Sequence, residues 1–174
     1  MSVVDCSAGI AIEDNDPHIW TSPRNALTMV ESILAGLSLI DPDGADLYQA
    51  NGLAYVAALR QLDRDVADLL SAGDERHFLI YHPSFAYFAR DYRLVQLAIE
   101  AEGKSPTPRL VQDCIDWARQ YRLQYVFVSP QSASAEAESI AEAIRGRLLY
   151  VDPLPDDYLS ATRAAAEAFA LELE

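Results

Sequence analysis

Phe78-Leu79-Ile80-Tyr81 is a continuous apolar run of strand length, and His82-Pro83 follows it directly. Three more runs of this kind lie further along the chain, at Leu94 to Ile99, Tyr125 to Val128 and Leu148 to Val151. Continuous rather than alternating apolar residues are typical of parallel strands that are covered on both faces. The four runs therefore predict four parallel strands in one sheet.

Helical patterns separate these runs along the chain. They span Ser84 to Tyr92, Pro108 to Tyr121 and Ser134 to Ile144, and a last helix is expected from Asp157 to Leu171. Strands that alternate with helices indicate βαβ units with right-handed crossovers. This part of the sequence predicts an α/β fold in which helices flank the four-stranded parallel sheet.

Two longer helices are expected ahead of the sheet, because apolar residues recur every three or four positions over 22–40 and again over 45–70. Ser22 is a favourable N-cap and Pro23 suits the first helical position, so the first helix has a clear start. Asp41-Pro42-Asp43-Gly44 separates the two helices. The weaker signals are a short strand at Val3-Val4-Asp5, a loop over 9–16, a candidate kink at Gly52 and a helix end at Ser71-Ala72-Gly73-Asp74.

Composition restricts the class of partner. The 174 residues are 51% hydrophobic, which suits one domain with a substantial core. The net charge of -14 opposes binding to nucleic acid or to an anionic membrane, although most of it is expected to be solvated helix surface. No apolar run reaches the roughly 20 residues of a membrane span, and the N-terminus lacks the pattern of an export signal.

The two cysteines supply no metal-site pattern. Cys6 and Cys114 lie far apart in the sequence, and neither belongs to a CxxC pair. Two free thiols are the expected state, with a single structural disulfide as the alternative.

Polar residues follow all four predicted strands. Parallel strands bring their carboxyl ends to one edge of a sheet, where ligands bind. The residues delivered there are His82, Glu100, Ser129-Pro130-Gln131 and Asp152. His82 and Asp152 each precede a proline, which keeps the residue before it extended and so determines the direction in which the strand exits.

A second histidine, His18, stands in a turn just ahead of the helix start at Ser22. Imidazoles from His18 and His82 and the carboxylate of Asp152 form a set of two nitrogens and one oxygen that suits zinc, with a fourth position open. Manganese prefers more oxygen and is the weaker candidate. His77 is expected to have no functional role, because it lies roughly 16 Å from His82 at about 3.3 Å per residue along the same strand.

Four motifs, in this order and spacing, resemble the zinc- and manganese-binding lipoproteins and periplasmic solute-binding proteins of ABC importers. They are Asp16-Pro17-His18-Ile19-Trp20-Thr21-Ser22-Pro23, Tyr81-His82-Pro83-Ser84-Phe85-Ala86-Tyr87-Phe88-Ala89, Glu102-Gly103-Lys104-Ser105-Pro106-Thr107-Pro108 and Val151-Asp152-Pro153-Leu154. The resemblance extends over almost the whole chain from Asp5 onward. Histidine rather than glutamate at position 82 resembles the zinc branch.

The resemblance implies two α/β lobes joined by a long rigid helix, with the metal ion held between the lobes. It assigns 1–21 to a remnant strand and the loop that leads to the metal motif, 22–40 to the inter-lobe helix and 41–174 to the C-terminal lobe. It implies His18, His82 and Asp152 as three ligands, an ABC permease as partner, and a periplasmic or membrane-anchored extracellular location.

The chain departs from this family pattern at its N-terminus. Members usually have a complete N-terminal lobe that supplies a further histidine, whereas only Val3 to Gly9 stands at that place here. The sequence is therefore interpreted as an isolated C-terminal lobe with an incomplete or empty zinc site. Glu13-Asp14-Asn15-Asp16 stands where the zinc branch often has a histidine-rich acidic loop.

Two rival hypotheses remain. The same three residues with an open zinc position would suit a metal-dependent hydrolase, in which the zinc activates water. Against this, Glu100 is the only other carboxylate at a strand end, and no GxSxG motif occurs. A metal-free interaction domain that forms homo-oligomers through the exposed cleft face is the third hypothesis. The prediction is a metal-binding protein that is not an enzyme.

Overall fold

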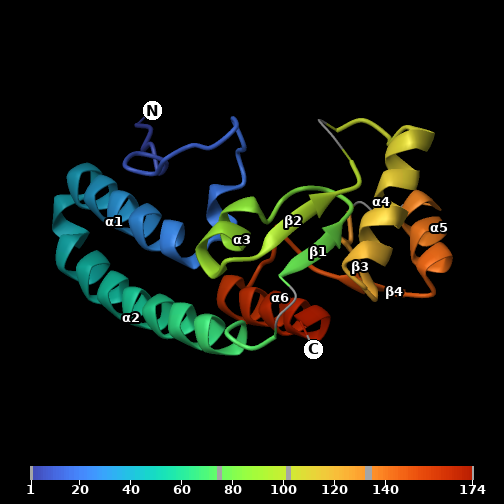
Figure 1. Cartoon of the computed structure of the whole chain (residues 1–174). Coiled ribbons are helices and arrows are strands. Elements are labelled where there is room, and N and C mark those ends of the chain that lie inside the picture. The colour runs from blue at the N-terminus through green and yellow to red at the C-terminus, as the bar shows by residue number, and fades with distance from the viewer. Residues whose placement is uncertain (1, 74–75, 101–102, 132–134, 174) are drawn as a thin grey trace. The chain divides into compact units, whose positions relative to one another are not determined.

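The computed structural model describes residues 2–73, 76–100, 103–131 and 135–173. Met1–Asp65 forms one compact unit and Val66–Glu174 forms another, and the boundary between them falls inside helix α2, Ala45–Leu69 (Figure 1). Among the residues that the structure describes, none of the helices combines the length and the apolar character needed to cross a membrane.

The first unit contains the first of the two long helices that the sequence predicted and most of the second. A 3₁₀ turn, η1, spans Ile19–Thr21, α1 spans Pro23–Ile40, and a second 3₁₀ turn, η2, at Pro42–Gly44 leads into α2. Ser22 is the N-cap as predicted: its hydroxyl oxygen accepts hydrogen bonds from the backbone amides of Arg24 and Asn25, both at 3.1 Å. These bonds satisfy two of the free amides at the helix start.

Gly52 brings α1 and α2 into close contact. Helix α2 continues unbroken through this residue, and a side chain there would collide with Leu34 of α1. The ion pair between Arg24 Nε and Asp63 Oδ1, at 2.9 Å, joins the same two helices at their other ends. The glycine expected as a candidate kink is therefore a packing position.

The prediction of a strand at Val3-Val4-Asp5 is wrong. These residues form no strand, and Val4 packs over Gly36 of α1. The Asp5 carboxylate accepts hydrogen bonds from the Ser7 amide at 2.9 Å and the Ser7 hydroxyl at 2.6 Å, which lower the pKa of Asp5. Such local bonds compete with strand pairing and favour a turn. The predicted loop over 9–16 is confirmed.

The second unit contains the predicted parallel sheet. Its strands are β1 (His77–Ile80), β2 (Val95–Ala98), β3 (Tyr125–Val128) and β4 (Arg147–Tyr150), all parallel and in the order β2-β1-β3-β4. The helices are α3 (Ala86–Tyr92), α4 (Pro108–Gln120), α5 (Ala135–Ile144) and α6 (Tyr158–Leu173). The predicted starting residue Ser134, the helix-end residue Asp74 and the motif residue Glu102 lie outside the described residues. Helix α3 starts at Ala86 rather than Ser84, because the Ser84 amide instead donates to the His82 carbonyl at 2.8 Å in a turn.

The sheet has an apolar core on each face. Helices α4 and α5 lie side by side against one face and enclose a cluster that includes Leu79, Cys114 and Val126 (Figure 1). Phe169 of α6 lies on the other side, with its ring 4.5 Å from that of Phe78 and 4.9 Å from that of Phe127 between centroids. Successive residues of a strand point to opposite faces, so one strand contributes to both clusters.

The expectation that both faces of every strand are covered holds only at the centre of the sheet. The residues of β1 and β3 are buried apart from the first of each strand, whereas β2 and β4 are largely half-exposed. Tyr150 at the end of β4 is 60% exposed. Edge strands have a neighbour on one side only, and an apolar run does not reveal which strands lie at the edges.

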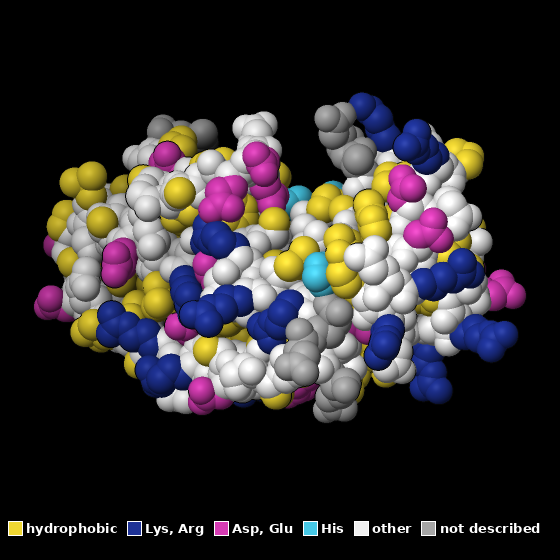
Figure 2. All heavy atoms as spheres, viewed as in Figure 1, with side chains coloured by type: hydrophobic (Ala, Val, Ile, Leu, Met, Phe, Trp, Pro, Cys, Tyr) yellow, Lys and Arg dark blue, Asp and Glu magenta, His cyan; other side chains and the backbone are white. Residues whose placement is uncertain are grey.

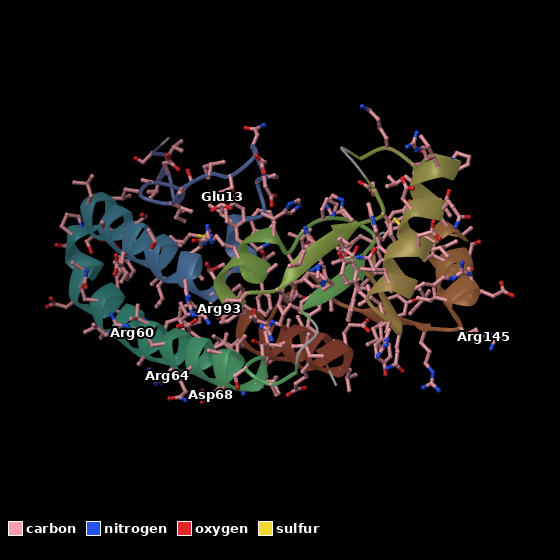
Figure 3. The ribbon with its side chains drawn as sticks, viewed as in Figure 1. Glu13, Arg60, Arg64, Asp68, Arg93 and Arg145 are labelled. Carbon is pink, nitrogen blue, oxygen red and sulfur yellow. The ribbon has the colours of Figure 1, made fainter. Side chains whose placement is uncertain are left out.

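Three helices of the sheet unit are followed by an arginine in the left-handed conformation, at a position where glycine is the common residue. Arg93, Arg122 and Arg145 follow α3, α4 and α5 with φ of 60°, 57° and 58°. The backbone amide of the residue after each arginine donates a hydrogen bond to the carbonyl five residues before it, as in a Schellman motif. Each of these three hydrogen bonds is 2.8 Å long. Figure 3 shows Arg93 beyond α3 and Arg145 beyond α5. A basic side chain at this place complements the negative end of the helix dipole.

Neither cysteine forms a disulfide, as expected, and the two thiols should differ in reactivity. Cys114 is fully buried, and burial together with the nearby Asp113 carboxylate raises the pKa of its thiol to about 11. Because the thiolate is the reactive form, a raised pKa keeps Cys114 protonated and inert at pH 8. An Ellman titration of the native protein at this pH should count one rapid thiol, and a second only in denaturant.

The Cys6→Ser variant is the matched control for that titration, because it should leave no rapid thiol. Two rapid thiols in the native wild-type protein would show that the α4 face of the sheet is not closed.

Candidate metal centre

A tight turn precedes His18. The Asp16 amide donates to the Glu13 carbonyl at 2.8 Å, and the two residues between them, Asp14 and Asn15, have φ of 47° and 58°. Asp and Asn tolerate this left-handed conformation better than other residues with a side chain. Figure 3 labels Glu13 at the start of the turn. The acidic segment therefore has a defined geometry that delivers Asp16 next to His18.

Asp16 holds the His18 side chain. Its Oδ1 lies 2.6 Å from His18 Nδ1 and also accepts the His18 backbone amide at 2.9 Å. The His18 ring meets the Trp20 ring edge-on with 5.5 Å between centroids, and Thr21 Oγ1 donates to the His18 carbonyl at 2.9 Å. Only 18% of the His18 side chain is exposed. The carboxylate accepts a hydrogen bond from Nδ1–H in this arrangement, so Nε2 carries the lone pair in the neutral ring.

His82 has a similar partner in the second unit. It lies two residues beyond the end of β1, and its Nδ1 is 3.0 Å from Oε1 of Glu100, which lies two residues beyond the end of β2. The Glu100 amide donates to the Tyr81 carbonyl at 2.9 Å, so strand pairing continues up to this pair. The His82 side chain is 34% exposed and that of Glu100 is 12% exposed.

Asp152 is supported by the loop that follows β3. Its Oδ1 accepts the Leu154 backbone amide at 3.0 Å and Nε2 of Gln131 at 3.2 Å. The Ser129-Pro130-Gln131 segment, which the sequence placed at the same edge of the sheet, therefore contributes a side chain that holds the Asp152 carboxylate.

Strand register relates His82 to Asp152. Ile80 of β1 is level with Phe127 of β3, which is level with Leu149 of β4. His82 and Asp152 therefore leave the same carboxyl edge two strands apart, roughly 10 Å at the usual strand spacing. After β1 the chain adds β2 on one side of it and then β3 and β4 on the other, so the strand order switches between β1 and β3. Open α/β sheets bind ligands at such a switch point.

His77 lies at the opposite edge, as predicted. It is the first residue of β1, and its ring stacks on that of Tyr121 with 3.7 Å between centroids. It is half-buried rather than a fully exposed surface residue. This stacking is a packing contact.

The three predicted ligands belong to different units. His18 lies in the first unit, whereas His82 and Asp152 lie in the second. Within either unit, the described residues contain no three His, Cys, Asp or Glu side chains placed to hold a metal ion. The three-residue ligand set therefore stays a prediction.

Sequence reasoning missed the groups that support these side chains. Asp16 was noted only as part of the acidic loop and of the first motif, and Glu100 and Gln131 only as strand-end residues. The short separation of Asp16 from His18 was a usable signal. The contact of Glu100 with His82 requires β1 and β2 to be neighbours, which the sequence does not state.

Comparison with protein families matches residues 1–171 to the family described as zinc-uptake complex component A, periplasmic. The zinc-binding protein AdcA of Streptococcus pyogenes is 29% identical over 141 residues, which are 80% of this chain and 27% of that protein. A putative metal-binding protein of Chlamydia muridarum is 32% identical over 156 residues, covering 89% of this chain and 56% of that protein. This chain thus spans between a quarter and just over half of these curated relatives.

Among solved structures, a crystal structure of ZnuA superposes on the whole chain with a TM-score of 0.96 and 36% identity, and 70% of that chain is covered. An uptake component of this kind is a binding protein, which agrees with the prediction that the chain is not an enzyme. Since the family match extends over nearly the whole chain, the protein belongs to the family of periplasmic component A proteins of zinc-uptake complexes.

Proposed function

We propose that this chain binds a zinc ion as part of the solute-binding protein of an ABC importer, in the periplasm or at the outer cell surface. His18, His82 and Asp152 are the proposed ligands. The ion is cargo that the protein hands to a permease, and the protein does not catalyse a reaction on it.

The observation that carries the proposal is that both candidate histidines have Nδ1 against a carboxylate. Asp16 lies 2.6 Å from His18 and Glu100 lies 3.0 Å from His82. Metal-binding histidines almost always donate their second ring N–H to such a partner, which selects the tautomer and orients the ring. The two pairs lie in different units, and their histidines belong to different sequence motifs, so each pair supports the proposal separately.

The net charge of the chain and the donor atoms of the proposed ligands favour a divalent cation. Asp and Glu side chains are scattered among Lys and Arg over the face shown in Figure 2, within a chain of net charge -14. Two imidazole nitrogens and one carboxylate favour zinc over manganese. The hydrolase hypothesis has less support, because Glu100, the only other carboxylate at a strand end, is hydrogen-bonded to His82.

Calorimetric titration of EDTA-treated protein tests this function. Zinc is expected to bind with one ion per chain, and manganese is expected to bind more weakly. A chain that takes up neither metal would contradict the proposal and favour the metal-free interaction domain. Tighter binding of manganese than of zinc would contradict the assignment of the cargo.

A further inference from the structure

Strand β2 supplies none of the proposed metal ligands, but two of its side chains reach the segment that carries His82. Glu100, just beyond the strand, lies 3.0 Å from His82 Nδ1. Gln96, within the strand, accepts the Phe85 backbone amide through Oε1 at 2.9 Å. The register of β1 and β2 pairs Ile80 with Ala98, so its continuation places Glu100 level with His82. Gln96 is level with Phe78, and the chain folds back after His82 to bring the Phe85 amide to it.

We propose that Glu100 and Gln96 are positioning residues for His82. Glu100 acts on the imidazole and holds the proton on Nδ1, so that Nε2 is the nitrogen presented to the ion. Gln96 acts on the main chain three residues later and holds the turn from which His82 projects. The proposal rests on the proposed function for its ligand, zinc.

Gln96 provides a hydrogen-bond acceptor for a backbone amide at the start of α3. Phe85 is the N-cap of α3 and its side chain makes no capping hydrogen bond. The amides at a helix start need acceptors from outside the helix. Gln96 provides one for Phe85 itself, while the Ser84 amide bonds to the His82 carbonyl at 2.8 Å. The segment from His82 to Phe85 is therefore held at its far end by β2.

Burial distinguishes this arrangement from a surface ion pair. The Glu100 side chain is only 12% exposed, and its backbone amide is bonded to Tyr81, so the carboxylate has little freedom to turn away. Groups that orient a ligand in this way typically change metal affinity by about 10- to 100-fold when they are removed.

The experiment compares Glu100→Ala, Glu100→Gln and Gln96→Ala in the full chain by two measurements. The first is zinc affinity, by competition with a chelator. The second is the tautomer of His82 in metal-free protein at alkaline pH, from ¹⁵N shifts of the imidazole, with His82→Ala used to assign the signal. Glu142→Gln on the exposed side of α5 is the matched control, because it removes the same charge elsewhere.

Glu100→Ala should weaken zinc binding by about 10- to 100-fold and shift the His82 proton away from Nδ1. Glu100→Gln should lose less affinity, because its amide oxygen still accepts from Nδ1. Gln96→Ala should lower affinity without changing the tautomer, since its hydrogen bond is to the Phe85 main chain and not to the His82 ring. Glu142→Gln should match the wild-type protein in both measurements.

An unchanged tautomer and unchanged affinity in Glu100→Ala would overturn the role of Glu100, and unchanged affinity in Gln96→Ala would overturn that of Gln96. A wild-type chain that binds no zinc would instead contradict the proposed function, while the tautomer measurement would still decide whether Glu100 orients His82. The count of one rapid thiol, from Cys6, verifies that each variant is folded.

Discussion

His82→Ala is expected to weaken zinc binding by more than the roughly 10- to 100-fold that loss of a group bonded to a metal ligand typically costs. The substitution removes a proposed ligand together with the nitrogen that Glu100 orients. It also leaves the Glu100 carboxylate without the imidazole on its Oε1. Asp152→Ala should cause a loss of the same kind. Chelator competition with EDTA-treated protein measures both.

His77→Ala is the matched control for this result. His77 is the same type of residue and stands at the other end of β1, where it stacks on Tyr121. Its removal should leave zinc affinity unchanged. Equal losses from His77→Ala and His82→Ala would show that the ion binds elsewhere or that either change disturbs the whole sheet.

Phe169→Ala should lower the free energy of unfolding by about 3 to 5 kcal/mol. The Phe169 ring is fully buried, and its centroid lies 4.5 to 5.5 Å from the rings of four other phenylalanines. These are Phe78, Phe85, Phe88 and Phe127, which come from β1, the turn before α3, α3 itself and β3. Alanine would leave a cavity at the point where all of them meet. A loss of this size is a large fraction of the roughly 5 to 15 kcal/mol that stabilises a typical domain.

Urea denaturation measures this change, with fluorescence of Trp117 in a Trp20→Phe background to report on the second unit. Leu171→Ala is the control on the same helix, because Leu171 is 44% exposed and should change stability by no more than about 0.5 kcal/mol. If both variants lost the same stability, the aromatic cluster would not be the centre of the core.

Local patterns predicted most of the elements because each depends on residues close in sequence. The apolar runs indicated β1 and β3, and the Ser22-Pro23 pair indicated the start of α1. The prediction at Val3-Val4-Asp5 was wrong because two hydrogen bonds from Ser7 to Asp5 favour a turn over an isolated strand. The exposure of β2 and β4 was not predictable, since it depends on which strands lie at the edges.

The sequence by itself determined the parallel α/β class, the two long helices, and the placement of His82 and Asp152 at strand ends. It also identified His18 in the turn ahead of α1. Only the tertiary structure decided that Glu100 meets His82 across 18 residues and that Gln131 meets Asp152 across 21. Both contacts depend on the strand order β2-β1-β3-β4, which makes β1 and β2 neighbours and likewise β3 and β4. Periodicity and spacing report how a segment buries its own side chains, whereas strand order results from how all the helices and strands pack together.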